Sequence, residues 1–363
     1  MKSKTLLILV LLFAVAILAS SLINRNANHG DVATSGQLLA PGLDEALNDV
    51  MRLKMTFNTG DSGVTFEKSD SGWTISEKFN YAADTGKIRR FLIRLGEARI
   101  LEQKTSNPEF YGRLGVADVG SEEGPGTLVE VSGASPLLEI IVGNVETRAG
   151  SGTYVRRNGE TGSYLIDSEM VAPRQVMDWL DKQILDIPSK SVEDILITHN
   201  DGETIHLERI ADWMVVRDLP ADRELTSPTA SESMSTVVSG LSLEDVMPAN
   251  EFDRGDPDAI AVYEIADGRV VSLAAWKSDD DHFFTVDLTM SPEAEVTAEP
   301  AADGDDENNP LESEAIERAD PVKVARTASR IGSWVFKVPA AKYDLVVKRL
   351  EDMLKPLEKA AES

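Results

Sequence analysis

The stretch Val64-Thr65-Phe66-Glu67-Lys68, followed by a turn and Trp73, decides the fold of this chain because a second stretch repeats it. The second copy is Ile205-His206-Leu207-Glu208-Arg209, followed by a turn and Trp213. In both copies apolar and polar residues alternate, which is typical of a strand with one buried face. We therefore expect two equivalent repeats, each with its tryptophan in the core.

The elements expected around each tryptophan follow one order in both halves: a strand meander, a helix, further strands and a closing helix. The helices are expected at about 84–101, 173–180, 231–240 and 343–354. Antiparallel strands followed by helices indicate an α+β fold, with two helices packed on the sheet of each repeat. We place the first repeat at 43–188 and the second at 189–360.

The N-terminus predicts a membrane anchor. Residues 5–23 carry no charge, and as a helix they span about 28 Å, which matches a bilayer core. Lys2 and Lys4 precede this stretch and only Arg25 closely follows it, so the chain after it is expected outside the cytoplasm. We expect 1–23 to be a single-pass anchor in the inner (cytoplasmic) membrane with a periplasmic globular part. A cleaved signal peptide is the alternative and implies the same compartment.

The composition excludes several classes of protein. The formal net charge of -26 argues against nucleic-acid binding, and the absence of cysteine excludes disulfides, a thiolate nucleophile and a lipid-modified cysteine. Residues 24–42 are rich in small polar residues and are expected to be a flexible tether. Residues 291–320 are dominated by acidic residues and proline, so we expect a disordered insertion there.

The candidate catalytic and metal-binding patterns are weak. Gly60-Asp61-Ser62-Gly63 resembles a serine protease nucleophile segment, but no histidine stands in a suitable context and a turn is the better interpretation. The four histidines are too scattered for a metal site. Asp279-Asp280-Asp281 beside His282 offers oxygen ligands for a hard cation, yet a solvated turn explains it equally simply. We expect no cofactor and no metal.

One helix stands out by its charge. Lys87, Arg89, Arg90 and Arg94 make the outer side of the first helix basic in an otherwise acidic protein. This side is our candidate contact for an acidic partner or for anionic lipid headgroups. A simply solvated helix face is the alternative.

Several motifs together resemble a known family. They are Trp73-x-Ile75, Tyr81-Ala82-Ala83-Asp84, Phe110-Tyr111-Gly112-x-Leu114-Gly115-Val116, Leu138-Glu139-Ile140-Ile141-Val142-Gly143, Tyr154-Val155-Arg156 and Tyr164-Leu165-Ile166-Asp167. Over about 50–187 the chain resembles the family catalogued as domain of unknown function 4340. The resemblance implies a membrane-anchored extracytoplasmic protein, often encoded beside ABC-type exporters of the gliding-motility kind, and it implies no catalytic residues.

These observations favour a non-enzymatic accessory or binding protein in a membrane complex such as an ABC exporter. One alternative is an envelope hydrolase or carbohydrate-processing enzyme that uses paired carboxylates, which this acidic chain could supply at many positions. Another is a structural spacer that holds something away from the membrane.

Overall fold

The computed structural model describes residues 35–57, 63–122, 124, 126–133, 138–147, 151–217, 219–227, 229–253, 255–292 and 318–356. The expected anchor at 1–23 and residues 293–317 of the expected insertion lie outside this part of the chain. Within the described part, no helix is long and apolar enough to cross a membrane. The chain divides into two compact units, Met1–Asp181 and Lys182–Ser363.

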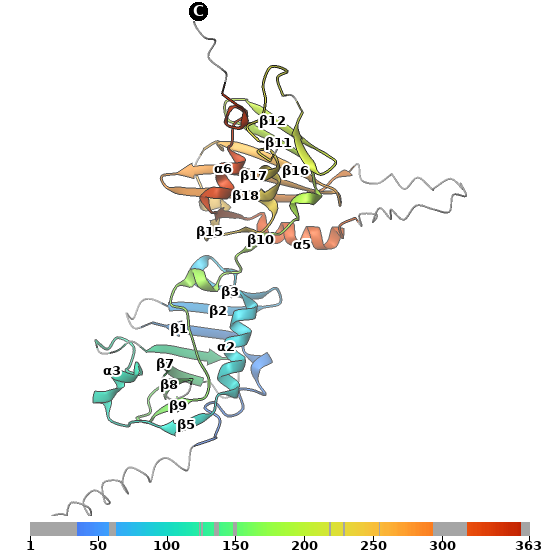
Figure 1. The fold of residues 1–363 in the computed structure, drawn as a ribbon. Coiled ribbons are helices and arrows are strands. Elements are labelled where there is room, and N and C mark those ends of the chain that lie inside the picture. Colours follow the sequence, from blue (N-terminus) through green and yellow to red (C-terminus); the bar gives the residue numbers. More distant parts are fainter. Residues whose placement is uncertain are drawn as a thin grey trace, which may run out of the picture. The chain divides into compact units, whose positions relative to one another are not determined.

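The first unit is built on one antiparallel sheet of nine strands among the described residues, in the order β4-β3-β2-β1-β6-β7-β8-β9-β5 (Figure 1). The strands are β1 (Arg52–Thr56), β2 (Gly63–Ser69), β3 (Gly72–Ile75), β4 (Tyr81–Ala82), β5 (Ile100–Gln103), β6 (Thr127–Ser132), β7 (Leu138–Glu146), β8 (Gly152–Arg157) and β9 (Ser163–Ile166). Alternation of buried and exposed side chains along β1 and β6 gives the sheet a buried inner face.

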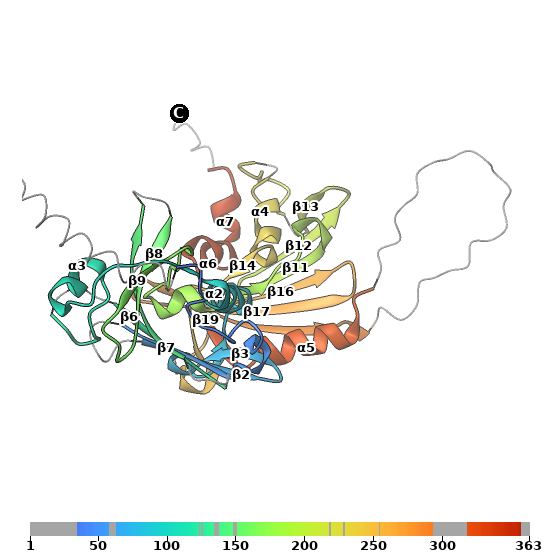
Figure 2. The same cartoon turned by 90° about the horizontal axis from the view of Figure 1, so that it is seen from below.

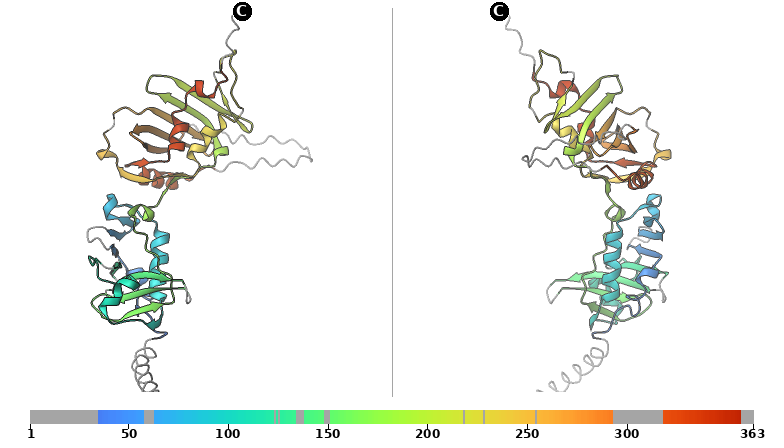
Figure 3. Two further views of the ribbon diagram at one scale, coloured as in Figure 1. Left: turned by 60° about the vertical axis from the view of Figure 1, so that its left-hand side comes forward. Right: turned by 90° about the vertical axis from the view of Figure 1, so that its right-hand side faces the viewer.

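Helix α2 (Thr85–Glu97) covers the inner face of this sheet (Figures 1 and 3). It begins where the carboxylate of Asp84 accepts a hydrogen bond from the backbone N–H of Lys87. Ile88, Phe91 and Leu95 recur at helical spacing and are buried. Trp179 packs between helix and sheet, with its ring centroid 5.0 Å from that of Phe66 and 6.3 Å from that of Phe91.

The outer face of the first sheet has a cover of its own. A 3₁₀ turn (Pro108–Phe110) leads into the short helix α3 (Tyr111–Leu114), and the segment continues to Ala117. Tyr111, Val116 and Ala117 form a small second core with Ile141 of β7. The motif Phe110-Tyr111-Gly112-x-Leu114-Gly115-Val116, called the Tyr-Gly motif from here on, therefore covers the outer face over β7 and β8.

The second unit is built on an antiparallel sheet of eight strands among the described residues, in the order β13-β12-β11-β16-β17-β18-β19-β15. The strands are β11 (Val192–His199), β12 (Thr204–Ile210), β13 (Trp213–Val216), β15 (Asp245–Pro248), β16 (Ala259–Ile265), β17 (Arg269–Ser278), β18 (Asp281–Met290) and β19 (Trp334–Lys337), and a separate pair joins β10 (Gln183–Leu185) to β14 (Leu241–Ser242). The helices are α4 (Glu232–Ser235), α5 (Pro321–Ile331), α6 (Ala340–Val346) and α7 (Leu350–Met353) (Figure 2).

The expected α+β fold with two helices on each sheet is wrong, because both units are mainly antiparallel β structure with few helices. The segment expected as a closing helix at 173–180 is extended except for a 3₁₀ turn at Val176–Trp179, since Trp179 enters the core from an extended chain. The expected helix at 231–240 shrinks to α4 and a 3₁₀ turn. The helix expected at 343–354 is broken between α6 and α7.

The pairing of the two tryptophans is also wrong. In the first unit Lys68 faces Trp73 across the β2–β3 hairpin, whereas in the second Arg209 faces Met214. Both hairpin turns have two residues, but Trp213 pairs with Ile210 directly at the turn, as Gly72 pairs with Ser69, so Met214 takes the place of Trp73. Trp73 is 7% exposed and Trp213 is 50% exposed. A one-residue slip moves a strand side chain to the opposite face of the sheet.

Candidate functional site

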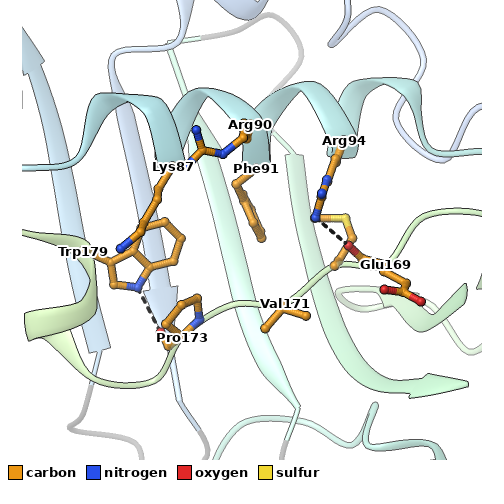
Figure 4. Close-up of a pocket in the computed structure, with 9 residues that line it drawn as sticks. Lys87, Arg90, Phe91, Arg94, Glu169, Val171, Pro173 and Trp179 are labelled. Atoms are coloured by element: carbon orange, nitrogen blue, oxygen red, sulfur yellow. Dashed lines mark hydrogen bonds between the residues drawn. The ribbon is translucent and has the colours of Figure 1, made fainter. Parts of the chain in front are cut away.

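The basic side of α2 borders a pocket of about 130 Å³ in the first unit (Figure 4). Three of the four predicted contact residues, Lys87, Arg90 and Arg94, line it along one edge of the helix. Arg89 does not line it, because consecutive helical residues point about 100° apart. The structure thus brings three of the predicted residues together and separates the fourth.

The floor of the pocket is apolar. Phe91 comes from α2, and the extended segment that follows β9 supplies Met170, Val171 and Pro173, with Trp179 at its end. The indole N–H of Trp179 donates to the carbonyl of Pro173 at 2.9 Å, which fixes the ring across the pocket (Figure 4). Val171 is 65% exposed, whereas Phe91, Met170 and Trp179 are buried, so the apolar floor meets solvent mainly at Val171.

Two of the cations are held in place by the backbone opposite. The ammonium of Lys87 donates to the carbonyl of Asp178 at 2.5 Å and lies 3.7 Å from the carboxylate of Asp84. The Nη1 of Arg94 donates to the carbonyl of Glu169 at 3.2 Å, which leaves its other N–H groups available. Arg90 has no ion-pair or hydrogen-bond partner among the described residues. Its guanidinium is therefore the most available donor of the site.

The chemistry of the pocket suits an anionic group attached to an apolar one. An enclosed apolar cavity of about 150 Å³ accommodates a benzene ring, so this smaller, open pocket has room for one side chain. Arg90 and Arg94 lie beside that space and offer the paired donors that carboxylates and phosphates accept. Glu169 is the only acidic residue of the lining, and Arg94 bonds its carbonyl rather than its carboxylate.

A second hollow, of about 460 Å³, holds two carboxylates but does not favour a hydrolase. It lies beside α3 and contains Asp118 and Glu160. The carboxylate of Asp118 pairs with the guanidinium of Arg156, and that of Glu160 lies 3.6 Å from Arg157. Both carboxylates of this hollow are thus engaged by arginine side chains.

The other candidates from the sequence that the structure describes are engaged in contacts of their own. Among the described residues, no group of three His, Asp or Glu side chains could hold a metal ion. Asp281 forms an ion pair with Lys337 at 2.6 Å, and the ring of His282 packs on Tyr343 at 4.6 Å. Asp61 and Ser62 lie outside the described residues.

Titrating groups cluster at one end of the second unit, where they anchor α7. Burial lowers the pKa of His199, and the nearby guanidinium of Arg349 acts in the same direction. The backbone N–H of Glu203 and the side chain of Arg349 lower the pKa of Asp201. Burial alone would raise the pKa of Glu203, but hydrogen bonds from Arg349 and from the backbone N–H of Leu350 outweigh it and lower the pKa.

Comparison with known proteins gives one match. The family model described as a domain of unknown function (DUF4340) matches residues 73–264. The chain belongs to this family. The DUF4340 match begins at Trp73 in β3 and ends at Glu264 in β16, so it includes α2, the pocket and the Tyr-Gly motif. No curated protein and no solved structure matches the chain.

Sequence reasoning found the cations of the pocket but missed its apolar half. Phe91 was expected on the buried face of α2, and Trp179 on a helix that does not form. Met170, Val171 and Pro173 are brought to α2 by an extended chain 75 or more residues later in the sequence. The one available signal was the apolar Met170-Val171-Ala172-Pro173 run, which lies outside any predicted strand.

Proposed function

We propose that this chain is an accessory, non-enzymatic binding component of a membrane complex such as an ABC-type exporter, anchored by residues 1–23 and exposed outside the cytoplasm. The observation that supports a binding role best is the α2 pocket, where Lys87, Arg90 and Arg94 border an apolar lining that includes the exposed Val171. The uncharged stretch at 5–23 supports the membrane location.

The ligand of this site is a segment of a partner protein that places an apolar side chain beside a carboxylate. A headgroup alone would use only the cations and leave the exposed side chain of Val171 without a contact. Exposed apolar surface ringed by polar groups is typical of a protein contact site. The pair of guanidinium groups supplies orientation, and the floor supplies burial.

Photocrosslinking in intact membranes tests this proposal. A photoreactive residue at Val171, which lines the pocket and is exposed, should give one protein adduct. Arg90→Gln combined with Arg94→Gln should reduce the adduct at least tenfold, because both donors are lost. Arg89→Gln, on the same helix but outside the pocket, is the matched control and should leave the adduct unchanged.

Two outcomes would contradict the proposal. An adduct to phospholipid in place of protein would make α2 a membrane-contact surface. A protein adduct that is equally sensitive to Arg89→Gln and to the Arg90 and Arg94 pair would mean that the general positive charge of the helix, and not the pocket, attracts the partner.

A further inference from the structure

The second unit carries an exposed apolar surface on the outer face of its sheet, at the end formed by β13, β12, β11 and β16. The inner face of these strands is fully buried, as for Ile195, Leu207 and Tyr263. On the opposite face Leu196, Val215 and Ile260 are each 39 to 40% exposed. The sequence of this unit has no counterpart of Tyr111-Gly112. Phe252, which follows the 3₁₀ turn Ala249–Glu251, packs on Trp276 and Phe283, with ring centroids 5.2 and 5.4 Å away.

Three carboxylates form one row across this outer face. Glu208, Asp194 and Glu264 are direct cross-strand neighbours on β12, β11 and β16. Like charges placed opposite each other destabilise a sheet. Asp194 is partly compensated by His206 at 2.7 Å, and Glu208 by Arg217 at 3.4 Å. Glu264 has no ion-pair or hydrogen-bond partner among the described residues.

The first unit shows what the same positions look like on an ordinary solvated face. The row that corresponds to Glu208, Asp194 and Glu264 is Glu67, Arg52 and Ser132. In this row an acid lies opposite a base, and the third residue is uncharged.

The next row of cross-strand neighbours also differs between the two units. Lys54 and Glu130 form an ion pair at 3.5 Å in the first unit, and the second unit has Leu196 opposite Val262 at these positions. The second unit has therefore exchanged a neutral polar surface for one that is both apolar and acidic.

We propose that this surface, named here the acidic face (Asp194, Leu196, Glu208, Val215, Ile260 and Glu264), docks a cationic amphipathic segment of a partner protein. Lysine or arginine side chains of that segment lie over the carboxylate row, and its apolar side chains contact Leu196, Ile260 and Val215. Charge complementarity selects this occupant, because the row holds three carboxylates and Glu264 has no ionic partner among the described residues.

The charge of the acidic face excludes the competing occupants. Anionic lipid headgroups carry the same sign as the carboxylate row. Residues 293–317 of this chain are also acidic, so they are repelled rather than bound. A second copy placed face to face would oppose two identical carboxylate rows. The inference does not depend on the α2 pocket, which has the opposite charge and lies in the other unit.

Binding of model peptides to the full chain tests the acidic face. The probes are two fluorescently labelled 18-residue peptides with the same amphipathic pattern, one of lysine and leucine and one of glutamate and leucine, measured by anisotropy. The lysine peptide should bind and the glutamate peptide should not. Leu196→Lys combined with Val262→Glu installs the ion pair of the first unit at unchanged net charge, and it should weaken binding of the lysine peptide at least tenfold.

Matched variants separate the acidic face from the general negative charge of the chain. Glu264→Ser copies Ser132 of the first unit and should weaken binding of the lysine peptide severalfold, whereas Glu45→Ser, an exposed acid of the first unit, should not. The circular dichroism spectrum of each variant should match that of the parent chain. Equal binding by the Leu196 and Val262 double variant overturns the proposal, as does equal sensitivity to Glu45→Ser. Dimers in sedimentation that the double variant abolishes also overturn it, because a second copy would then cover the face.

Discussion

Met214, and not Trp213, occupies the position in the second unit that Trp73 occupies in the first. Across the hairpin, Trp73 pairs with Lys68, and Met214 pairs with Arg209. The hydrogen bonds that the backbone carbonyls of Trp73 and Met214 accept support this equivalence. The carbonyl of Trp73 accepts from Ala83 N–H next to β4, and the carbonyl of Met214 accepts from the hydroxyl of Ser231, which together with Glu232 replaces the missing edge strand.

Alanine substitutions distinguish the two tryptophans. Trp73→Ala removes a buried ring and should lower the free energy of unfolding of the first unit by about 3 to 5 kcal/mol. Trp213→Ala should cost less than about 1 kcal/mol, because the side chain is half exposed. Met214→Ala is the control in the second unit and should cost about 2 to 5 kcal/mol. Urea unfolding checks all three, and equal losses for both tryptophans would contradict the register.

The strands could be predicted from the sequence because period-two alternation is a local signal. β2 and β12 contain the two alternating stretches 64–68 and 205–209 and extend one residue beyond them at each end. The alternating pattern does not distinguish Trp213 from Met214 as the counterpart of Trp73, although Lys68 precedes Trp73 by five residues and Arg209 precedes Trp213 by four. Counting from the turn would have revealed the shift, since hairpin length sets the register.

The helices were overpredicted because apolar spacing alone does not distinguish a helix from an extended segment that reaches into the core. Trp179 and Leu180 satisfy helical spacing with Val176, yet the chain forms only a 3₁₀ turn at Val176–Trp179 and becomes extended at Leu180, which bridges to Ala83. The pocket depends on this long-range contact, so only its cations, which lie on one true helix, could be predicted.

Arg156 should prove a structural residue of the family motif rather than a ligand contact. Its guanidinium is 3% exposed and donates to the carbonyls of Val116 and Glu160 at 2.9 Å each and to the carboxylate of Asp118. Arg156→Met should lower the free energy of unfolding of the first unit by about 3 kcal/mol, because hydrogen bonds from a charged donor are lost and a carbonyl is left buried. Asp118→Asn should cost less than about 1 kcal/mol, since that side chain is 75% exposed. Thermal unfolding that ranks the two variants in the reverse order would refute this role.

Gly115 of the Tyr-Gly motif should tolerate no side chain. Its φ is +70°, and an added Cβ would lie 2.8 Å from the amide oxygen of Asn144 on β7. Gly159 is the matched control, with a φ of +78° and no atom within 4 Å of the added Cβ. Gly159→Ala should cost about 1 kcal/mol through the backbone alone, and Gly115→Ala at least about 1 kcal/mol more through crowding. Chemical denaturation of the two variants measures the difference, and similar losses would show that β7 yields to the new side chain.

Acid should weaken the second unit through His199. The folded pKa of this buried imidazole lies below the unfolded value of about 6.5, so between the two values the unfolded chain holds the additional proton. The stability of the second unit therefore falls as the pH decreases from about 7 through this window. Below about pH 4.3 the stability falls again. The folded pKa values of Asp201 and Glu203 are also lowered, so the unfolded chain binds protons on these two carboxylates more readily than the folded chain does.

Calorimetry of the full chain between about pH 7.5 and about pH 2 separates the two stages of this acid response. His199→Leu removes the buried titrating group, whose Nε2 has no hydrogen-bond partner among the described residues, and should abolish the loss between pH 7 and 5. Arg349→Gln should diminish the first stage only in part, because burial is the larger cause of the lowered His199 pKa. It should diminish the second stage more, because the carboxylates lose the guanidinium that stabilises their ionised form. Parallel profiles for the parent chain and His199→Leu would show that another group carries the response near neutral pH.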